Sequence, residues 1–169
     1  MSKESFIKIL WTPWRMSYIA SADKTKKCIF CEALEKPDEY YVVKETSHSI
    51  ALLNAYPYNT GHVMIAPKRH VSDVDLLSEE ELIDLARLLK VIIRAIRIEY
   101  NPHGFNIGIN IGRAAGAGIE DHLHIHIVPR WVGDTNFMPV VSGTKTLPED
   151  LDTTRKRIIS ALRSIEGSL

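Results

Sequence analysis

The chain alternates histidine with aliphatic residues in the stretch His122-Leu123-His124-Ile125-His126-Ile127-Val128-Pro129. Side chains of a β-strand alternate between its two faces with a rise of ~3.3 Å per residue, so the pattern predicts a strand whose three imidazoles share one face at ~6.6 Å intervals. Ordinary polar residues would serve a solvent-facing strand, whereas imidazoles titrate near pH ~6.5. We therefore interpret the row as a functional site rather than as three surface histidines.

The composition is that of one globular domain. Of the 169 residues, 45% are hydrophobic and 25% charged, which allows one sizeable core without a second domain. The 21 basic residues balance 21 acidic ones, so no net charge favours nucleic acid or an anionic membrane as a partner. No apolar run approaches the ~20 residues that cross a bilayer, and the N-terminus leads into no signal-type stretch. A cytoplasmic protein is expected.

The remaining patterns predict an α+β fold with one long helix. Ser78 followed by Glu81 is typical of a capping box, and aliphatic residues then recur at helical spacing from Leu82 to Ile96. Asn101-Pro102 predicts the end of this helix. Further strands are expected at 40–44, 49–53, 62–66 and 105–111, and a closing helix from about 147 to 165.

Only two cysteines occur, Cys28 and Cys31, and they stand at the spacing from which two thiolates can bind one tetrahedral metal ion. Zinc is the first interpretation. A redox dithiol is the second, disfavoured because the segment before Cys28 is polar and basic where a strand is expected. Two unrelated packed thiols are the third. One pair supplies half of a zinc site, so the other ligands must come from elsewhere in the chain.

A loop of small residues, Gly112-Arg113-Ala114-Ala115-Gly116-Ala117-Gly118, leads into the histidine stretch. Small residues let the backbone approach a ligand and offer its amides to an anion. Alone, such a loop predicts no more than a flexible connection. Beside three histidines it favours a phosphate site.

Together these segments resemble the histidine-triad superfamily, nucleotidyl hydrolases and transferases that attack an α-phosphate with the middle histidine. The stretch 122–128 is similar to the family's motif, and 53–70, from Leu53-Asn54 through Gly61-His62 to His70, resembles its N-terminal half. The resemblance covers roughly residues 28–131. It implies a histidine-triad-type antiparallel sheet with one long helix and a C-terminal helix.

The flanking segments, 10–15 with two tryptophans around a proline and 129–139, look most like the branch that contains bacterial diadenosine tetraphosphate phosphorylases. Tryptophans are costly to leave in water, so we expect the N-terminal segment to pack on the core or on a partner subunit. Residues 1–169 are then expected to form a single domain.

The resemblance and the chemistry of imidazole assign the catalytic residues. His124 is expected to carry AMP between two partners, because a neutral imidazole is a good nucleophile and its phosphorus–nitrogen adduct is labile. His126 is expected to contact the phosphate or the leaving oxygen. The resemblance implies that a backbone carbonyl, with His62 close by, fixes which nitrogen of His124 attacks. The implied substrate-binding residues are Asn54 at the ribose, Asn110, His62 and the backbone amides near Gly116 and Gly118.

The resemblance also implies a structural zinc site. Some triad proteins and the related hexose-phosphate uridylyltransferases bind zinc through a Cys-x-x-Cys pair, a later histidine and the first triad histidine. Carried over, the ligands are Cys28, Cys31, His70 and His122, a closed Cys₂His₂ set. His48 and His103, by contrast, are expected to be surface residues.

One position departs from the family's pattern. Many triad hydrolases carry a glutamine four residues before the first histidine, where this chain has Gly118. A glycine leaves room for a nucleophile bulkier than water, such as inorganic phosphate, and so favours phosphorolysis over hydrolysis. The alternative is that Arg113 or Asn136 replaces the glutamine.

Several functions remain open. The favoured one is a homodimeric enzyme, paired through its antiparallel sheets, that transfers AMP from dinucleoside polyphosphates through a nucleotidyl-histidine intermediate. A hydrolase of diadenosine tetraphosphate or of AMP conjugates in the same family is the first alternative. A hydrolase with all three histidines on one catalytic metal ion is disfavoured, because no further ligand motif follows them. A nucleotide-binding module without turnover is the last.

Overall fold

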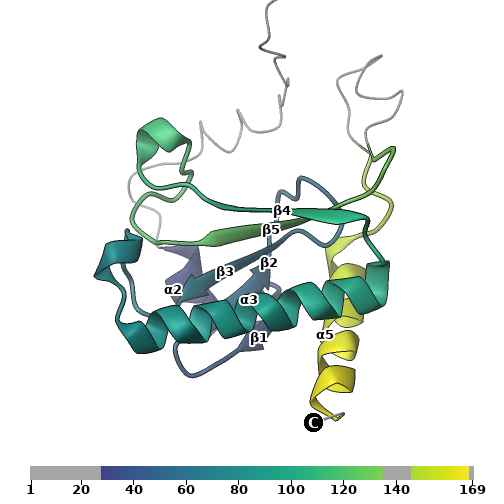
Figure 1. Ribbon diagram of the computed structural model, residues 1–169, viewed down its shortest axis with the longest axis horizontal. Coiled ribbons are helices and arrows are strands. Elements are labelled where there is room, and N and C mark those ends of the chain that lie inside the picture. Colours follow the sequence, from purple (N-terminus) through teal and green to yellow (C-terminus); the bar gives the residue numbers. More distant parts are fainter. Residues whose placement is uncertain (1–27, 135–145, 168–169) are drawn as a thin grey trace, which may run out of the picture. The chain divides into compact units, whose positions relative to one another are not determined.

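The computed structural model describes residues 28–134 and 146–167, so the predictions for segments 10–15 and 135–139 lie outside the described residues. Five antiparallel strands form one sheet in the order β1-β2-β3-β5-β4 (Figure 1). The strands are β1 (Val42–Glu45), β2 (Ser49–Leu53), β3 (Val63–Pro67), β4 (Gly104–Ile109) and β5 (Ile125–Arg130). The helices are α2 (Ile29–Glu35), α3 (Glu79–Tyr100) and α5 (Leu151–Glu166), with short 3₁₀ turns η1 (Val74–Leu76) and η2 (Arg113–Ala115). The predicted α+β class is confirmed.

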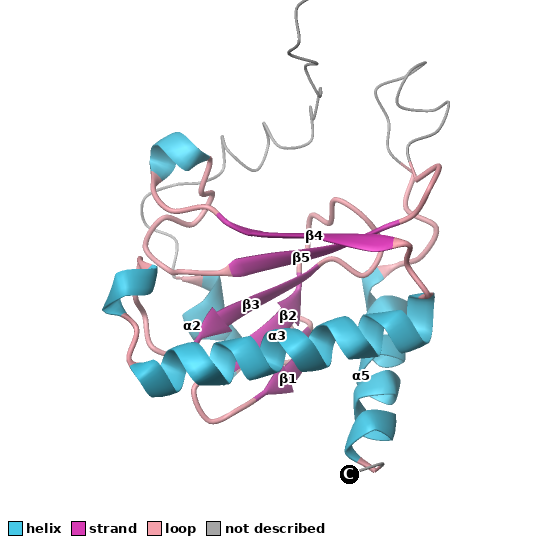
Figure 2. Cartoon of the chain, viewed as in Figure 1, coloured by secondary structure: helices cyan, strands magenta, loops and turns pink. Residues whose placement is uncertain are grey.

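Helices α3 and α5 pack on one face of the sheet, and helix α2 packs on the other (Figure 2). One face packs on α3 and α5, and its core contains Leu53, Ile65 and Ile127. The other face packs on α2, where Phe30 and Ala33 contact residues of β2 and β3 that include Leu52 and Met64. Side chains of a strand alternate between its two faces, so the residue of β5 between Ile125 and Ile127, which is His126, points to the α2 face. His126 is therefore on the face opposite the long helix.

Helix α3 begins as its sequence predicts. The side chain of Ser78 accepts a hydrogen bond from the backbone amide of Glu81, and the Glu81 carboxylate accepts one from the amide of Ser78. The helix ends at Asn101, which has the left-handed conformation typical of a C-terminal cap, just before Pro102. Helix α5 starts later than predicted, at Leu151, because the Asp150 side chain caps its first turn.

Helix α2 was not predicted by the sequence pattern. It has seven residues, of which only Phe30 and Ala33 are buried, so it is too short to show a helical repeat.

Among the described residues, no helix is both long enough and apolar enough to cross a membrane.

The strand predicted over 122–129 is wrong for its first three residues. Strand β5 begins at Ile125, because the amide of Leu123 donates to the carbonyl of Val71, outside the sheet, at 2.6 Å. His122 and His124 consequently precede the strand. The three imidazoles do not form one evenly spaced row.

Candidate active site and metal site

Two of the three triad histidines, His124 and His126, lie together, and His122 lies apart from them. The ring centroids of His124 and His126 lie 4.9 Å apart in an edge-to-face arrangement. His124 is 3% exposed, whereas His126 is only partly buried. The imidazole of His122 is directed instead toward the two cysteines. Two triad histidines thus lie side by side, and the third belongs to a separate cluster with the cysteines.

A hydrogen bond fixes the tautomer of His124. Its Nδ1 lies 2.9 Å from the backbone carbonyl oxygen of His122. A carbonyl can only accept, so Nδ1 carries the proton and Nε2 carries the lone pair. Burial lowers the pKa of His124 below its usual value, which keeps the ring neutral at neutral pH. The ring has the protonation state that a nitrogen nucleophile needs.

A second chain of hydrogen bonds fixes the tautomer of His126. The backbone amide of Tyr58 donates to Nδ1 of His62 at 3.1 Å, so a neutral His62 has its proton on Nε2. That nitrogen lies 3.0 Å from Nδ1 of His126 and donates to it. His126 therefore has its own proton on Nε2. The resemblance implied a backbone carbonyl at His124 with His62 close by; the structure has the His122 carbonyl there, and His62 forms a hydrogen bond with His126.

Tyr58 supports this arrangement and was missed from the sequence. Its ring stacks on His62 with centroids 5.0 Å apart, and it lies 6.2 Å from the His126 ring. His62 is 1% exposed beneath it. The only sequence signal was a tyrosine four residues before His62, in a loop rich in turn residues.

The structure brings the four predicted metal ligands together. One ligand atom from each of Cys28, Cys31, His70 and His122 lies within 4.8 Å of all the others. Nδ1 of His122 is 3.1 Å from Sγ of Cys28 and 3.8 Å from Sγ of Cys31, and Nδ1 of His70 is 3.4 Å from Sγ of Cys31. Tetrahedral zinc, with Zn–S of about 2.3 Å and Zn–N of about 2.1 Å, separates sulfur from nitrogen by roughly 3.5 Å. The donor set and its spacing fit zinc.

The surroundings of His122 also suit a ligand. Its Nε2 donates to the carbonyl of Pro67 at 2.8 Å, which leaves the Nδ1 lone pair facing the thiols. Metal-binding histidines commonly donate their second nitrogen to such a carbonyl, which fixes the ring. Burial, then the neighbouring Cys28, raises the pKa of Cys31 to about 11. A bound divalent cation reverses that tendency, since it stabilises the thiolate.

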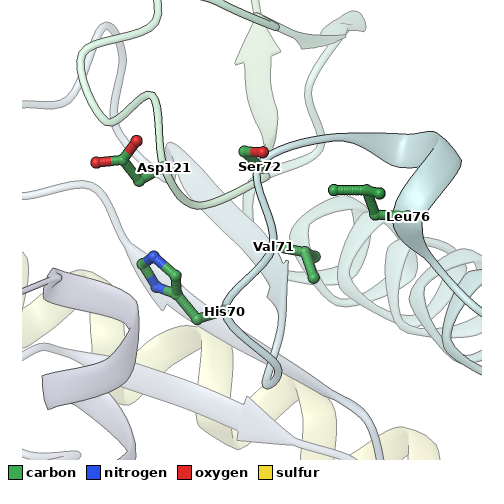
Figure 3. A pocket seen from close by; sticks show the side chains of 5 residues that line it. All are labelled: His70, Val71, Ser72, Leu76 and Asp121. Carbon is green, nitrogen blue, oxygen red and sulfur yellow. The ribbon is translucent and has the colours of Figure 1, made fainter.

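A groove of about 330 Å³ borders the metal ligands. Its lining residues are His70, Val71, Ser72, Leu76 and Asp121, and in Figure 3 the His70 ring and the Asp121 carboxylate face the same space. His70 is the exposed member of the four ligands. The groove is open to solvent, and His70 is the one candidate ligand among its lining residues.

The predicted substrate-binding residues lie on loops next to the sheet. Asn54 directly follows β2, and its Oδ1 accepts from the amide of Tyr56 at 2.9 Å. Asn110 directly follows β4, one position beyond the pair Ile109 and Ile125, on the side of His124. Their ribose and phosphate contacts remain predictions.

The glycine loop differs from its prediction in one respect. The amide of Gly116 donates to the carbonyl of Arg113 at 3.0 Å, and Gly116 has a φ of 84° that favours glycine. Its amide is thus part of the η2 turn rather than directed at an anion, whereas Gly118 follows the turn and is exposed. Across the sheet, Gly108 pairs with His126, and a Cβ at Gly108 would meet no atom of the described residues within 4 Å. The described part of the chain therefore leaves space beside His126.

His48 and His103 are both exposed, as expected. His103 accepts at Nδ1 from the amide of Val132 and so stabilises the chain after β5.

Three comparisons relate this arrangement to known proteins. The model of the HIT domain matches residues 35–132. The chain is 39% identical over 156 residues to an AP-4-A phosphorylase of Mycobacterium tuberculosis, covering 87% of this chain and 80% of the relative. It is 34% identical over 103 residues to an adenosine 5'-monophosphoramidase of Schizosaccharomyces pombe, covering 61% and 74%. A zinc-bound histidine triad family protein from Mycobacterium smegmatis superposes with a TM-score of 0.70 at 26% identity, covering 85% of this chain and 98% of the other.

Proposed function

This chain belongs to the HIT domain family, and on that premise we propose that it transfers AMP from a dinucleoside polyphosphate through a covalent nucleotidyl-histidine intermediate. The observation that carries the proposal is the hydrogen bond from Nδ1 of His124 to the His122 carbonyl at 2.9 Å. It gives Nε2 of His124 a lone pair in a buried, neutral ring. The likeness to an AP-4-A phosphorylase supports diadenosine tetraphosphate as the substrate class.

The first step forms the adduct. Nε2 of His124 attacks the α-phosphorus, and the bond to the bridging oxygen breaks with its electron pair going to the leaving polyphosphate. The N–H at Nε2 of His126 donates a hydrogen bond to that oxygen and so stabilises the negative charge that develops on the leaving polyphosphate, which departs as an anion. With diadenosine tetraphosphate, the products of this step are AMP bound to His124 and free ATP.

The second step releases the nucleotide. An oxygen of inorganic phosphate attacks the same phosphorus, the phosphorus–nitrogen bond breaks, and its electron pair returns to Nε2 of His124. The product is ADP. Asn110 and the amide of Gly118 are proposed to stabilise the charge on the phosphoryl oxygens, and Asn54 to contact the ribose. Gly116 contributes by shaping the turn, and the open face at Gly108 accommodates the leaving group.

Zinc is proposed to bind Cys28, Cys31, His70 and His122 and to act structurally. When bound, the ion cross-links α2 to the segments that follow β3 and precede β5. The zinc-bound relative supports this assignment, as does the closed donor set. A Cys-x-x-Cys pair that binds a metal ion instead of forming a disulfide is typical of a reducing compartment, which supports a cytoplasmic location.

The proposal is tested by incubating the protein with diadenosine tetraphosphate, with and without inorganic phosphate. ADP plus ATP, formed only when phosphate is present, is the expected result. AMP plus ATP would instead indicate hydrolysis by the same intermediate, the alternative favoured by likeness to the monophosphoramidase. Cleavage to two molecules of ADP would contradict attack by His124 at the α-phosphorus.

A homodimer is proposed through the edge of the sheet. Strand β4 is an edge strand of the described sheet, and it exposes Ile107 by 44% and Ile109 by 38%. An exposed apolar edge strand is a template for pairing with a second chain. Light scattering after size exclusion should give twice the chain mass, and Ile107→Lys with Ile109→Lys should give a monomer. A monomeric wild-type protein at micromolar concentration would contradict the dimer.

A further inference from the structure

Phe30 lies between the two cysteines in the sequence and between the two candidate sites in space. It is 0% exposed, on helix α2. Its ring centroid is 4.9 Å from that of His122 and 5.1 Å from that of His124. One aromatic ring therefore contacts both a metal ligand and the proposed nucleophile.

The contact with His124 restrains what the hydrogen bond leaves free. The bond from Nδ1 to the His122 carbonyl fixes one edge of the imidazole, but the ring can still tilt about that edge. The Phe30 ring lies against its face at an interplanar angle of 34°. A flat, buried side chain at this distance limits such tilting, because a close-packed interior leaves little space for it.

The position of Phe30 depends in turn on α2. This helix has seven residues, and Cys28 at its N-cap makes no side-chain capping hydrogen bond. A helix so short has little stability of its own, so tertiary contacts must hold it. Phe30 and Ala33 provide apolar contacts with β2 and β3, and Cys28 and Cys31 add contacts with His122 and His70 at the first turns of the helix.

We propose that Phe30 is a positioning residue, which holds the His124 imidazole for attack and couples its orientation to the metal site. The inference rests on the proposed role of His124 as the nucleophile. It also assigns to metal binding a second effect, on the orientation of the His124 ring, in addition to its effect on stability. Loss of the ion releases α2, moves Phe30 and lets the His124 ring tilt.

The test compares Phe30→Leu with Ile50→Val. Leucine keeps most of the apolar volume but not the flat ring, and Ile50 is a fully buried member of the same core cluster. The readouts are the ¹⁵N shifts of the His124 ring, assigned with His124→Gln, together with zinc content, kcat and KM. For Phe30→Leu we expect full zinc content, displaced His124 shifts and a kcat about tenfold lower with KM within about twofold, because small misplacements of a reacting group are costly. Ile50→Val should resemble the wild type.

Two outcomes overturn the inference. If Phe30→Leu, or the milder Phe30→Met where the leucine variant does not fold, matches Ile50→Val in both kcat and His124 shifts, Phe30 has only a packing role. If removal of zinc from the wild-type protein leaves the His124 shifts unchanged, the coupling is absent. The ¹⁵N shifts do not depend on turnover. Absence of AMP transfer by the wild type would therefore refute the proposed function. The ¹⁵N shifts would still show whether Phe30 positions the His124 ring.

Discussion

Nε2 of His62 donates a hydrogen bond to Nδ1 of His126 at 3.0 Å. The other nitrogen of His62 accepts from the amide of Tyr58, so the backbone of one loop determines which nitrogen of His126 carries its proton. The N–H that His126 is proposed to donate to the leaving oxygen is consequently set by a residue that need not touch the substrate.

Replacement of His62 tests this relationship. His62→Leu removes the donor to His126, so the N–H of His126 is no longer held at Nε2, and kcat should fall by roughly 10²-fold, the usual range for loss of one hydrogen-bond donor to developing charge. His62→Gln keeps an N–H donor in a side chain of similar reach, so it should lose less. Steady-state kinetics with diadenosine tetraphosphate provide the measurement. Equal losses in both variants would show that His62 acts by packing alone.

The second prediction concerns the nucleophile. His124→Ala should abolish turnover and leave nucleotide binding largely in place, because the ring makes the covalent bond while other groups hold the nucleotide. Calorimetric titration with a nucleotide measures binding, and acid-free quenching of the wild type should trap AMP on His124. Comparable losses in His124→Ala and His126→Ala, with no adduct in the wild type, would favour a three-histidine metal hydrolase.

Contacts between site residues that lie far apart in the sequence were less predictable than the helices and strands on which these residues lie. Helix α3 was predictable because Ser78 and Glu81 lie close in sequence and the apolar repeat extends over many turns. Helix α2 was not, because its seven residues are held by contacts with His70 and His122 that sequence spacing does not show. The hydrogen bond from His62 to His126 joins residues 64 positions apart. Such pairings depend on strand register, which the histidine pattern alone does not determine.

The third prediction concerns the metal. Metal analysis should find about one zinc per chain, and the double variant Cys28→Ser, Cys31→Ser should bind none. Its melting temperature should fall by roughly 10 °C or more, because structural zinc binding is coupled to folding. Thermal unfolding followed by circular dichroism provides the measurement. An unchanged melting temperature and full activity in the metal-free double variant would contradict the proposed structural zinc site.

The fourth prediction concerns pH and the loop that carries His70. The Arg69 guanidinium donates two hydrogen bonds to the Glu81 carboxylate, which is the main reason that the pKa of Glu81 is lowered to about 2. A depressed folded-state pKa stabilises the protein above the unfolded value of 4.5, and this stability is lost as pH falls toward 2.

Glu81→Gln should therefore lower the free energy of unfolding at pH 7 by roughly 1 to 2 kcal/mol, reduced by the solvent exposure of Arg69. It should also flatten the loss of stability between pH 4.5 and 2, set by the unfolded and folded pKa values. Glutamine still accepts from the Ser78 amide, so the capping box is retained. Glu79→Gln, at an exposed position of the same first turn, is the control. Identical acid unfolding of the two variants would assign the stability to the cap rather than to Arg69.

The last prediction concerns the acceptor of AMP. Gly118→Gln restores a side-chain amide beside the phosphate and crowds an incoming phosphate ion, so phosphorolysis should fall and the ratio of AMP to ADP should rise. The steric effect should dominate, because a site for two anions accommodates an added side chain poorly, whereas one hydrogen-bond donor contributes only ~1 to 3 kcal/mol. Gly118→Ala, which adds no amide, separates the two effects and should keep more phosphorolysis. Product ratios over a phosphate titration provide the measurement. If the glutamine variant keeps its full phosphate dependence, the acceptor is selected elsewhere, and Arg113, whose side chain is 89% exposed in the same loop, is the residue to change next.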